Sequence, residues 1–274
     1  MEEIAAKPTP FQRLLRFNRA SYALLSGFVL IVGLILYIWQ PLVREYLALF
    51  NPAVPLWRQV DWLLIGIFAF MTLTIMAGAD LRRDARTVLI GAVGGLVIEA
   101  WGTQTLLWSY YTAERPPLWI IPAWPIASLT IDRLARLADH LLPPGATRWL
   151  SRLYWLIFPG FYLLMLVFIW PTLDKSLTWM ALITCAGLTL APGNRRLMAL
   201  NFIAGAGLGY FLERWGTTRE CWTYYTLQTP PLFAVLAHGL AAAAFWRARE
   251  VLVGVWQGRG FASRMGQERD PSQN

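Results

Sequence analysis

The sequence predicts an all-α integral membrane protein with about eight transmembrane helices in two parallel four-helix repeats. The 274-residue chain is 57% hydrophobic and 15% charged, with a mean hydropathy of +0.44. Soluble domains carry about 25% charged residues. Its apolar residues gather into eight segments separated by basic loops. In addition, the stretch that begins at Glu99 recurs without gaps at Glu213, which indicates an internal duplication.

The eight apolar segments fill most of the chain between residues 22 and 246. They are Tyr22–Tyr37, Trp62–Ala79, Thr87–Leu107, Leu118–Leu134, Tyr154–Trp170, Leu177–Ala191, Leu197–Phe211 and Leu232–Trp246. A helix needs about 20 residues to cross a bilayer, and several segments are shorter. The sixth and eighth segments could therefore be tilted or partly re-entrant helices. The first is expected to act as the insertion signal, because no cleavable signal peptide precedes it.

The basic residues between these segments predict the topology. With a cytoplasmic N-terminus, 18 of the 24 Lys and Arg residues fall on the inner side. This bias is typical of an even number of spans with both termini in the cytoplasm. We therefore expect a multi-pass protein of the bacterial inner (plasma) membrane. The net charge of +8 is assigned to loops that meet anionic membrane lipids, and nucleic acid is excluded as a partner.

The duplication divides the chain into halves. Eleven residues of the first copy recur 114 positions later: Glu99, Trp101, Gly102, Thr103, Trp108, Tyr110, Tyr111, Thr112, Pro116, Pro117 and Leu118. Four spans per half would insert both halves the same way up, related by an axis along the membrane normal. We expect a cytoplasmic N-terminal segment at 1–21, four-helix halves at 22–140 and 141–256, and a disordered cytoplasmic tail at 257–274.

A carboxylate lies on a small-residue face in each copy. Gly91, Gly95 and Glu99 are spaced four residues apart, and Gly205, Gly209 and Glu213 repeat that spacing. Small residues four apart let membrane helices pack closely, so both glutamates should point into the bundle. An acidic residue in mid-membrane costs about 2.5–3.5 kcal/mol and is functional by default. The structural alternative is a cap, or an ion pair with an arginine: Arg115, Arg214 or Arg219.

Aromatic residues follow each glutamate. The two clusters are Trp108, Tyr110 and Tyr111, and Trp222, Tyr224 and Tyr225. One interpretation is an interfacial aromatic belt. The other is a substrate cavity, in which Gly102 and Gly216 end or kink the helix so that the aromatic rings fold back toward the carboxyl group. Thr103 and Thr217 would line the same cavity, and the proline pairs that follow would begin the next helices.

The halves differ at one position of interest. His238 lies where the offset places Trp124. A histidine there is either a packed, hydrogen-bonded residue or a partner that shares a proton with Glu213. The second interpretation suggests that one half does chemistry while the other shapes the site. No phosphate loop, dinucleotide fingerprint or metal-ligand cluster is present, so neither a cofactor nor a metal is expected. Cys185 and Cys221 are expected to serve in packing.

The string Glu99-x-x-Gly102, the aromatic cluster Trp108–Tyr111 and the segment Pro116–Pro125 resemble the carotenoid 1,2-hydratase family. The likeness covers about 30 residues per copy and extends more loosely to small membrane cyclases of lycopene and other terpenes. In this chain the tyrosines are adjacent and lie closer to the glutamate than in that family. The resemblance implies a carotenoid or polyprenyl substrate and membrane carboxylates that act as acids.

The sequence therefore predicts a cofactor-independent hydratase or cyclase, a lyase or isomerase, that acts on a lipophilic isoprenoid. Glu99, Glu213 and His238 are the expected catalytic residues, and the aromatic residues and threonines named above are the expected binding residues. Two alternatives stay open. One is a proton-coupled transporter, because two-fold repeats and intramembrane carboxylates suit transport equally. The other is a non-catalytic membrane scaffold in which the glycine stripes only pack helices.

Overall fold

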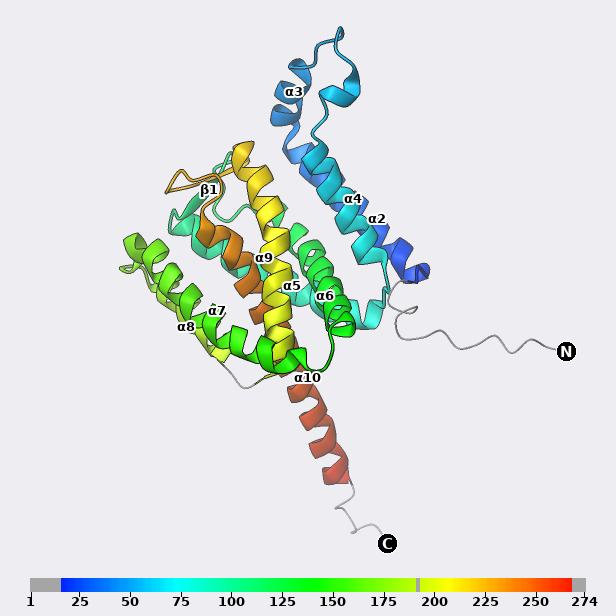
Figure 1. Ribbon diagram of the computed structural model, residues 1–274, viewed down its shortest axis with the longest axis vertical. Coiled ribbons are helices and arrows are strands. Elements are labelled where there is room, and N and C mark those ends of the chain that lie inside the picture. The colour runs from blue at the N-terminus through cyan, green and yellow to red at the C-terminus, as the bar shows by residue number, and fades with distance from the viewer. Residues whose placement is uncertain (1–15, 191–192, 268–274) are drawn as a thin grey trace, which may run out of the picture.

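The computed structural model describes residues 16–190 and 193–267, and these residues are almost wholly helical (Figure 1). The all-helical prediction is confirmed. The α-helices are α2 (Arg19–Ile38), α3 (Gln40–Ala48), α4 (Trp62–Met76), α5 (Leu81–Gln104), α6 (Ala123–Leu141), α7 (Ala146–Ile169), α8 (Ser176–Leu190), α9 (Arg195–Thr218) and α10 (Leu232–Gln267). The short elements are η1 (Leu56–Arg58), β1 (Trp108–Tyr110), η2 (Leu118–Ile120), η3 (Trp170–Thr172) and β2 (Trp222–Tyr224).

Each of the eight predicted apolar segments overlaps one long helix, although the bounds differ by several residues, and α3 is an additional short helix. Within the described residues, three stretches are long and apolar enough to cross a membrane: Arg19–Ile38, Leu81–Gln104 and Ala146–Thr172. Helices α4 and α8 are equally apolar but have only 15 residues each. The structure thus identifies three candidate membrane spans.

Polar side chains fix where several of the apolar helices begin. Asn18 caps α2, and its side chain forms a capping box with Ser21. Asp61, Asp80 and Asn194 cap α4, α5 and α9 by accepting from backbone N–H groups of the first turn. Each cap satisfies backbone N–H groups that the first turn of any helix leaves unpaired.

Helices α5, α6, α9 and α10 form the centre of the molecule, and the glycine stripes lie at their contacts. A Cβ atom at Gly91 would lie 2.8 Å from Ser128 Oγ of α6. A Cβ atom at Gly205 would lie 2.7 Å from the carbonyl oxygen of His238 in α10. No larger residue fits at either place without a shift of the neighbouring helix. The stripes therefore pack α5 on α6 and α9 on α10, as their spacing predicts.

Two helix pairs flank this centre on opposite sides (Figure 1). Helices α2 and α4 form one pair, and α4 contacts α6 and α9. Helices α7 and α8 form the other, and they contact α9 and α10. The connection from α2 to α4, which includes α3 and η1, projects beyond the bundle at one end (Figure 1).

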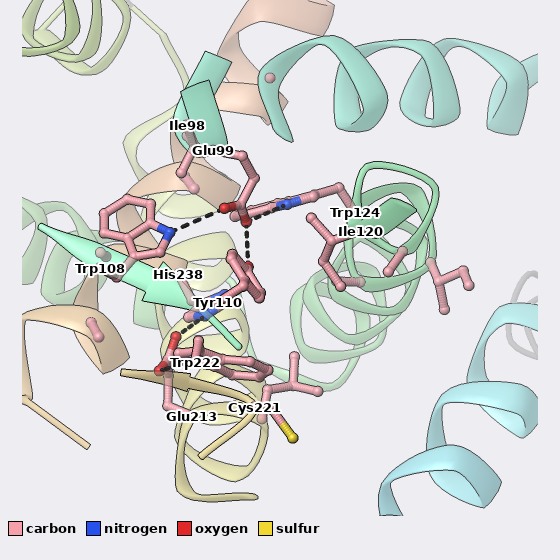
Figure 2. Close-up of a pocket in the computed structure, with 18 of the residues that line it drawn as sticks. Ile98, Glu99, Trp108, Tyr110, Ile120, Trp124, Glu213, Cys221, Trp222 and His238 are labelled. Carbon is pink, nitrogen blue, oxygen red and sulfur yellow. Dashed lines mark hydrogen bonds and ion pairs between the residues drawn. The ribbon is translucent and has the colours of Figure 1, made fainter. Parts of the chain in front are cut away.

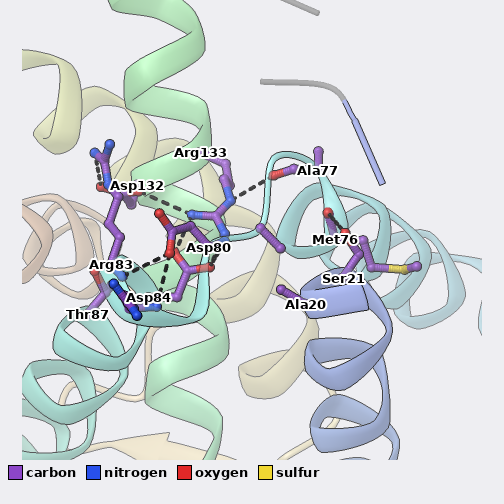
Figure 3. Close-up of polar contacts among 12 residues, drawn as sticks. Ala20, Ser21, Met76, Ala77, Asp80, Arg83, Asp84, Thr87, Asp132 and Arg133 are labelled. Atoms are coloured by element: carbon purple, nitrogen blue, oxygen red, sulfur yellow. Dashed lines mark hydrogen bonds and ion pairs between the residues drawn. The ribbon is translucent and has the colours of Figure 1, made fainter. Parts of the chain in front are cut away.

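A buried ion network ties the helices together near the start of α5 (Figure 3). The Arg133 guanidinium donates to both carboxylate oxygens of Asp84, at 2.9 and 2.6 Å, and its Nε donates to the Ala77 carbonyl at 2.9 Å. Asp132 accepts from Arg249 at 2.7 Å and from Arg136 at 2.9 Å. The network joins α5, α6, α10 and the end of α4, because each buried charge has a partner on another element.

The end of the chain differs from the prediction. Helix α10 runs to Gln267, whereas a disordered tail is expected over 257–274. The helix continues because no proline occurs between Pro231 and Pro271. The remainder of the predicted tail, 268–274, lies outside the described residues, as does most of the predicted N-terminal segment 1–21.

Candidate functional site

The two copies of the repeated motif continue into matching loops at the same end of the bundle (Figure 1). Each loop holds one short strand, and β1 pairs with β2 in antiparallel register. The pairs are Trp108 with Tyr224, Ser109 with Thr223 and Tyr110 with Trp222. The central pair consists of two residues that the offset relates to each other, so the ladder is symmetric about it.

The backbone repeats as closely as the sequence. Leu106 and Glu220 have left-handed φ angles of 62° and 55°, and Ala113 and Leu227 have 58° and 57°. The peptide bonds Arg115–Pro116 and Thr229–Pro230 are both cis. Each of these pairs keeps the 114-residue offset. Residues other than glycine adopt positive φ only rarely, so their recurrence indicates that both loops follow one course.

Gly102 and Gly216 do not end or kink their helices, contrary to the prediction. Helix α5 continues to Gln104 and α9 continues to Thr218. Both glycines instead make room for an aromatic ring. A Cβ atom at Gly102 would lie 1.9 Å from the Trp108 ring, and one at Gly216 would lie 2.0 Å from the Trp222 ring. The loops thus bring the rings back over the helix, while the helix itself stays regular.

The Glu99 carboxylate is buried and accepts three hydrogen bonds (Figure 2). The Trp108 indole N–H donates to Oε2 at 3.1 Å. The Tyr110 hydroxyl donates to Oε1 at 2.9 Å, and the Trp124 indole N–H donates to the same oxygen at 3.1 Å. Three donors replace the water that burial removes, which is what a carboxylate needs in an apolar bundle.

Glu213 has the same surroundings, with one exchange (Figure 2). The Trp222 indole N–H donates to Oε2 at 2.9 Å, and the Tyr224 hydroxyl donates to Oε1 at 2.9 Å. The third partner is the imidazole of His238, whose Nε2 lies 2.9 Å from Oε1. His238 thus occupies in the second copy the place that Trp124 occupies in the first.

The aromatic rings of the two copies interlock. The Trp108 ring lies 5.9 Å from the Tyr224 ring, and Tyr110 lies 5.9 Å from Trp222. Trp124 stacks on His238, with ring centroids 5.9 Å apart and an interplanar angle of 18°. The two carboxylates therefore belong to a single aromatic cluster, although they come from opposite halves of the chain.

The two tyrosine hydroxyls of the strands remain protonated. Burial raises the pKa of Tyr110 and of Tyr224 well above the usual range, and the neighbouring carboxylates Glu99 and Glu213 raise these pKa values further. Each hydroxyl is therefore held as a hydrogen-bond donor to its glutamate.

Both carboxylates line one cavity of about 750 Å³. It is lined by the α2–α4 pair and by the central helices, extends to residues of α7 and α8, and has a mostly apolar wall. Its lining includes residues that are largely exposed on the protein surface: Leu36, Leu89, Val93, Val97 and Leu252. The volume suits a single ligand of drug or lipid size. The cavity therefore combines an apolar wall and an apolar rim with two buried carboxylates.

Seven of the predicted site residues lie together around this cavity, namely Glu99, Trp108, Tyr110, Glu213, Trp222, Tyr224 and His238. The four others do not line it. Thr103 and Thr217 donate to the carbonyl oxygens of Glu99 and Glu213, one helical turn earlier, because their hydroxyls find no nearer acceptor inside the helix.

Tyr111 and Tyr225 also point away from the cavity, although both were predicted to bind substrate. The Tyr111 hydroxyl donates to the carbonyl of Ile38 at 3.1 Å, and that of Tyr225 donates to the carbonyl of Phe168 at 2.7 Å. Each directly follows the last residue of its strand, and successive side chains along an extended chain face opposite sides. They fasten the loops to the ends of α2 and α7.

Two of the three arginines considered as partners of the glutamates bind elsewhere. Arg214 donates to the Thr229 carbonyl at 3.0 Å. Arg219 pairs with Asp61 at 3.0 Å, and the Trp215 indole N–H donates to the same Asp61 oxygen at 3.0 Å. Asp61 and Arg219 both line the cavity. Sequence reasoning missed this role of Asp61 because nothing in the local sequence connects it with a residue 154 positions away.

Trp124 is the other residue that the sequence prediction left out. The sequence did contain a signal for this residue, because the 114-residue offset of the duplication aligns Trp124 with His238. Its contact with Glu99 follows once His238 is placed against Glu213.

No protein-family model, no curated protein and no solved structure matches the chain.

Proposed function

We propose that the protein is an integral-membrane enzyme that acts on a lipophilic isoprenoid, carotenoid or polyprenyl, by acid-catalysed hydration, cyclisation or isomerisation. The observation that carries this proposal is the apolar cavity into which two hydrogen-bonded carboxylates and their aromatic partners face. A water-soluble substrate would find few polar partners along its wall. A long apolar chain fits it, with the polar groups gathered at one part of its length.

The entrance favours a substrate that arrives from the bilayer. Leu89, Val93 and Val97 are more than half exposed, and they lie along the face of α5 that borders the cavity. Exposed apolar side chains of this kind are stable when lipid tails cover them. An isoprenoid dissolved in those tails would enter sideways, without crossing a head-group layer.

The chemistry needs an acid, a cation-stabilising wall and a base. A proton moves from the acid to one carbon of an isolated double bond, and its π electrons form the new C–H bond. The tertiary carbocation left behind is stabilised by the faces of Trp108 and Trp222 and by carboxylate charge. Water then adds and returns a proton to the site, or a neighbouring C–H gives up its proton and a new double bond forms. Either ending regenerates the acid, so no cofactor is consumed.

The proposed membrane arrangement follows the eight apolar helices. We propose that α2, α4, α5 and α6 cross as one half and α7, α8, α9 and α10 as the other, in the same orientation, with both termini in the cytoplasm of a bacterial inner membrane. The β1–β2 ladder supports the parallel relation, since it places both motif loops at one end. The basic residues at the opposite end support the orientation.

A lipid and pigment profile by mass spectrometry tests the proposal. A deletion strain is complemented with the wild-type protein, Glu99→Gln, Glu213→Gln or Glu114→Gln. The last is the matched control, because Glu114 is exposed and the offset aligns it with Gln228, so the other copy already carries glutamine there. We expect an isoprenoid precursor to accumulate in the deletion strain and with either cavity variant, and to disappear with the control.

Three other results would argue against the proposed enzymatic function. An unchanged profile in all strains, with each variant present at wild-type level, would contradict the isoprenoid enzyme. Substrate-dependent proton movement into vesicles that contain the purified protein, without chemical change of the substrate, would favour the proton-coupled transporter. If neither turnover nor transport is detected, a scaffold role gains support.

A further inference from the structure

The two carboxylates differ in their ability to hold a proton. Their surroundings match atom for atom except at one position, where Glu99 meets the indole of Trp124 and Glu213 meets the imidazole of His238. We infer that Glu213 and His238 share the exchangeable proton of the site, whereas Glu99 is held as a carboxylate by its three donors and exchanges no proton with a neighbour. The catalytic meaning of this division rests on the proposed function, but the protonation states do not.

Glu99 has only donors around it. Indole nitrogens donate and never accept, so Trp108 and Trp124 each hold one carboxyl oxygen as an acceptor. The Tyr110 hydroxyl, 2.9 Å from Oε1, takes the same role. A proton added to either oxygen would face an N–H group that cannot turn away from it. These three donors act against burial, which by itself favours the protonated carboxyl group, and no partner can take up a proton from Glu99.

Glu213 has one partner of another kind. Histidine is a donor in one protonation state of its Nε2 atom and an acceptor in the other. Across the 2.9 Å contact the proton can lie on Nε2 or on Oε1, while Trp222 and Tyr224 keep their positions. Proton exchange at this pair therefore requires no rearrangement of the buried cluster.

The division suits a reaction that passes through a cation. Trp124 stacks on His238 at 5.9 Å, so the residue that fixes Glu99 as an anion also contacts the proton-sharing imidazole. A fixed negative charge beside the proton donor stabilises the positive charge that protonation creates in the substrate. If both carboxylates held protons, no such charge would be ready. We assign Trp124 as a positioning residue and Glu213 with His238 as the acid.

The titrating pair is enclosed by a small set of ionisable groups. From the elements packed against it these are Glu99 of α5, Tyr110 of β1 and Tyr224 of β2, while Glu213 itself lies on α9 and His238 on α10. The same cavity is also lined by Cys221 and by the Asp61–Arg219 ion pair. A titration of the pair is therefore interpreted with two phenols that stay protonated, one neighbouring carboxyl group, one thiol and one ion pair in the same cavity.

Infrared difference spectroscopy tests the assignment without a substrate. The full-length protein, labelled with ¹³C-glutamate and reconstituted in vesicles, is titrated and the carboxylic-acid C=O band is followed. We expect one titrating band of buried character that is absent in Glu213→Gln, shifted in His238→Gln, retained in Glu99→Gln with a midpoint displaced by the loss of the neighbouring charge, and unchanged in the control Glu114→Gln. A titrating band that disappears in Glu99→Gln, or no titrating band in the wild-type protein, overturns the inference.

An exchange of the two differing residues gives a sharper test. In the double variant Trp124→His with His238→Trp, the proton pair should move to the first copy. The titrating band should then disappear on adding Glu99→Gln and survive Glu213→Gln. Gly95 already leaves room for Trp124, and Gly209 occupies the matching place beside residue 238, so the larger ring has space. A band that stays with Glu213 in the folded double variant contradicts the role given to His238.

His238→Gln covers the case in which the double variant does not fold, because glutamine retains a donor and has less bulk. If the lipid profile fails to change while these bands behave as expected, the proposed isoprenoid chemistry is wrong and the proton assignment stands. If the lipid profile changes but the titrating band belongs to Glu99, the proposed enzymatic activity is supported and the assignment of the proton to Glu213 and His238 is wrong.

Discussion

At the scale of single residues, each cavity carboxylate accepts a hydrogen bond from the tyrosine hydroxyl of the strand that follows it in the same copy of the motif. Tyr224→Phe removes only that hydroxyl and leaves the ring against Phe168 and Trp108. Since a buried carboxylate then loses a donor, we expect the free energy of unfolding to fall by about 1–3 kcal/mol. Tyr110→Phe should have a similar effect on Glu99. Thermal unfolding of the purified protein in detergent micelles measures both.

Tyr210→Phe is the matched control for these variants. Tyr210 is 49% exposed and lies on the outer face of α9, against Phe211. Its replacement should change the free energy of unfolding by less than about 0.5 kcal/mol. Equal unfolding of Tyr224→Phe and Tyr210→Phe would show that the buried hydrogen bond to Glu213 contributes nothing to stability.

At the scale of elements, the close approach of each motif loop to its helix depends on a glycine. Gly216→Ala would place a Cβ atom 2.0 Å from the Trp222 ring, which must then leave Glu213. We expect a loss of stability of about 1–3 kcal/mol from overpacking, together with a weakened carboxylate site. Gly207→Ala in the same helix meets nothing within 4 Å and should be neutral or stabilising by up to about 1 kcal/mol. Equal melting temperatures for the two variants would contradict the packing argument.

The α2–α4 pair is joined to the motif loops through Asp61. This residue caps α4 and accepts from Trp215 and Arg219. Asn also caps helices, so Asp61→Asn keeps the first turn of α4 and removes the charge that holds Arg219. A loss of about 1–2 kcal/mol at this contact would make the amides of α4 exchange roughly tenfold faster, with α6 unchanged.

Hydrogen exchange of the protein in nanodiscs measures this effect. Asp174→Asn is the control, because it breaks an exposed ion pair with Lys175 that contributes little. Unchanged exchange in α4 would mean that Asp61 does not hold the pair against the bundle.

The sequence predicted the eight helical segments and the inward glutamates, because hydropathy and glycine spacing are local signals. It did not predict the β1–β2 ladder, since strand pairing joins residues 112 to 116 positions apart through three-residue strands too short for a periodic pattern. It also misplaced Tyr111 and Thr103. Residue type alone does not tell which of two adjacent tyrosines faces a cavity, or whether a helical threonine bonds its own backbone.

At the scale of the whole molecule, the buried arginine–aspartate network and the two cavity carboxylates lie toward opposite ends of α5. The arginine–aspartate network fastens α5, α6 and α10 near the start of α5, while the carboxylates of the cavity lie toward the end of α5 that bears the motif loop. One end of the bundle is therefore cross-linked by ion pairs, and the other holds the site. A parallel repeat requires both motif loops to lie on one side of the membrane.

Labelling of introduced cysteines tests this arrangement. In a background without Cys185 and Cys221, Glu114→Cys and Gln228→Cys place a thiol on each exposed motif loop, and Gly145→Cys places one on the exposed link between α6 and α7. We expect a membrane-impermeant maleimide to label the two loop sites in intact cells. Gly145→Cys should react only after the membrane is permeabilised, because the basic residues around it are retained inside.

Each labelling pattern has a distinct meaning. Opposite behaviour of Glu114→Cys and Gln228→Cys would contradict both the parallel repeat and the β1–β2 pairing, since paired strands cannot lie on opposite sides of a bilayer. Labelling of all three sites from outside would place both ends of the bundle in one compartment and would reduce the crossings to fewer than eight. The expected pattern, two sites outside and one inside, requires an even number of crossings between residues 114 and 228. Both motif loops then lie on one side of the membrane, and one substrate in the cavity between them can reach both carboxylates.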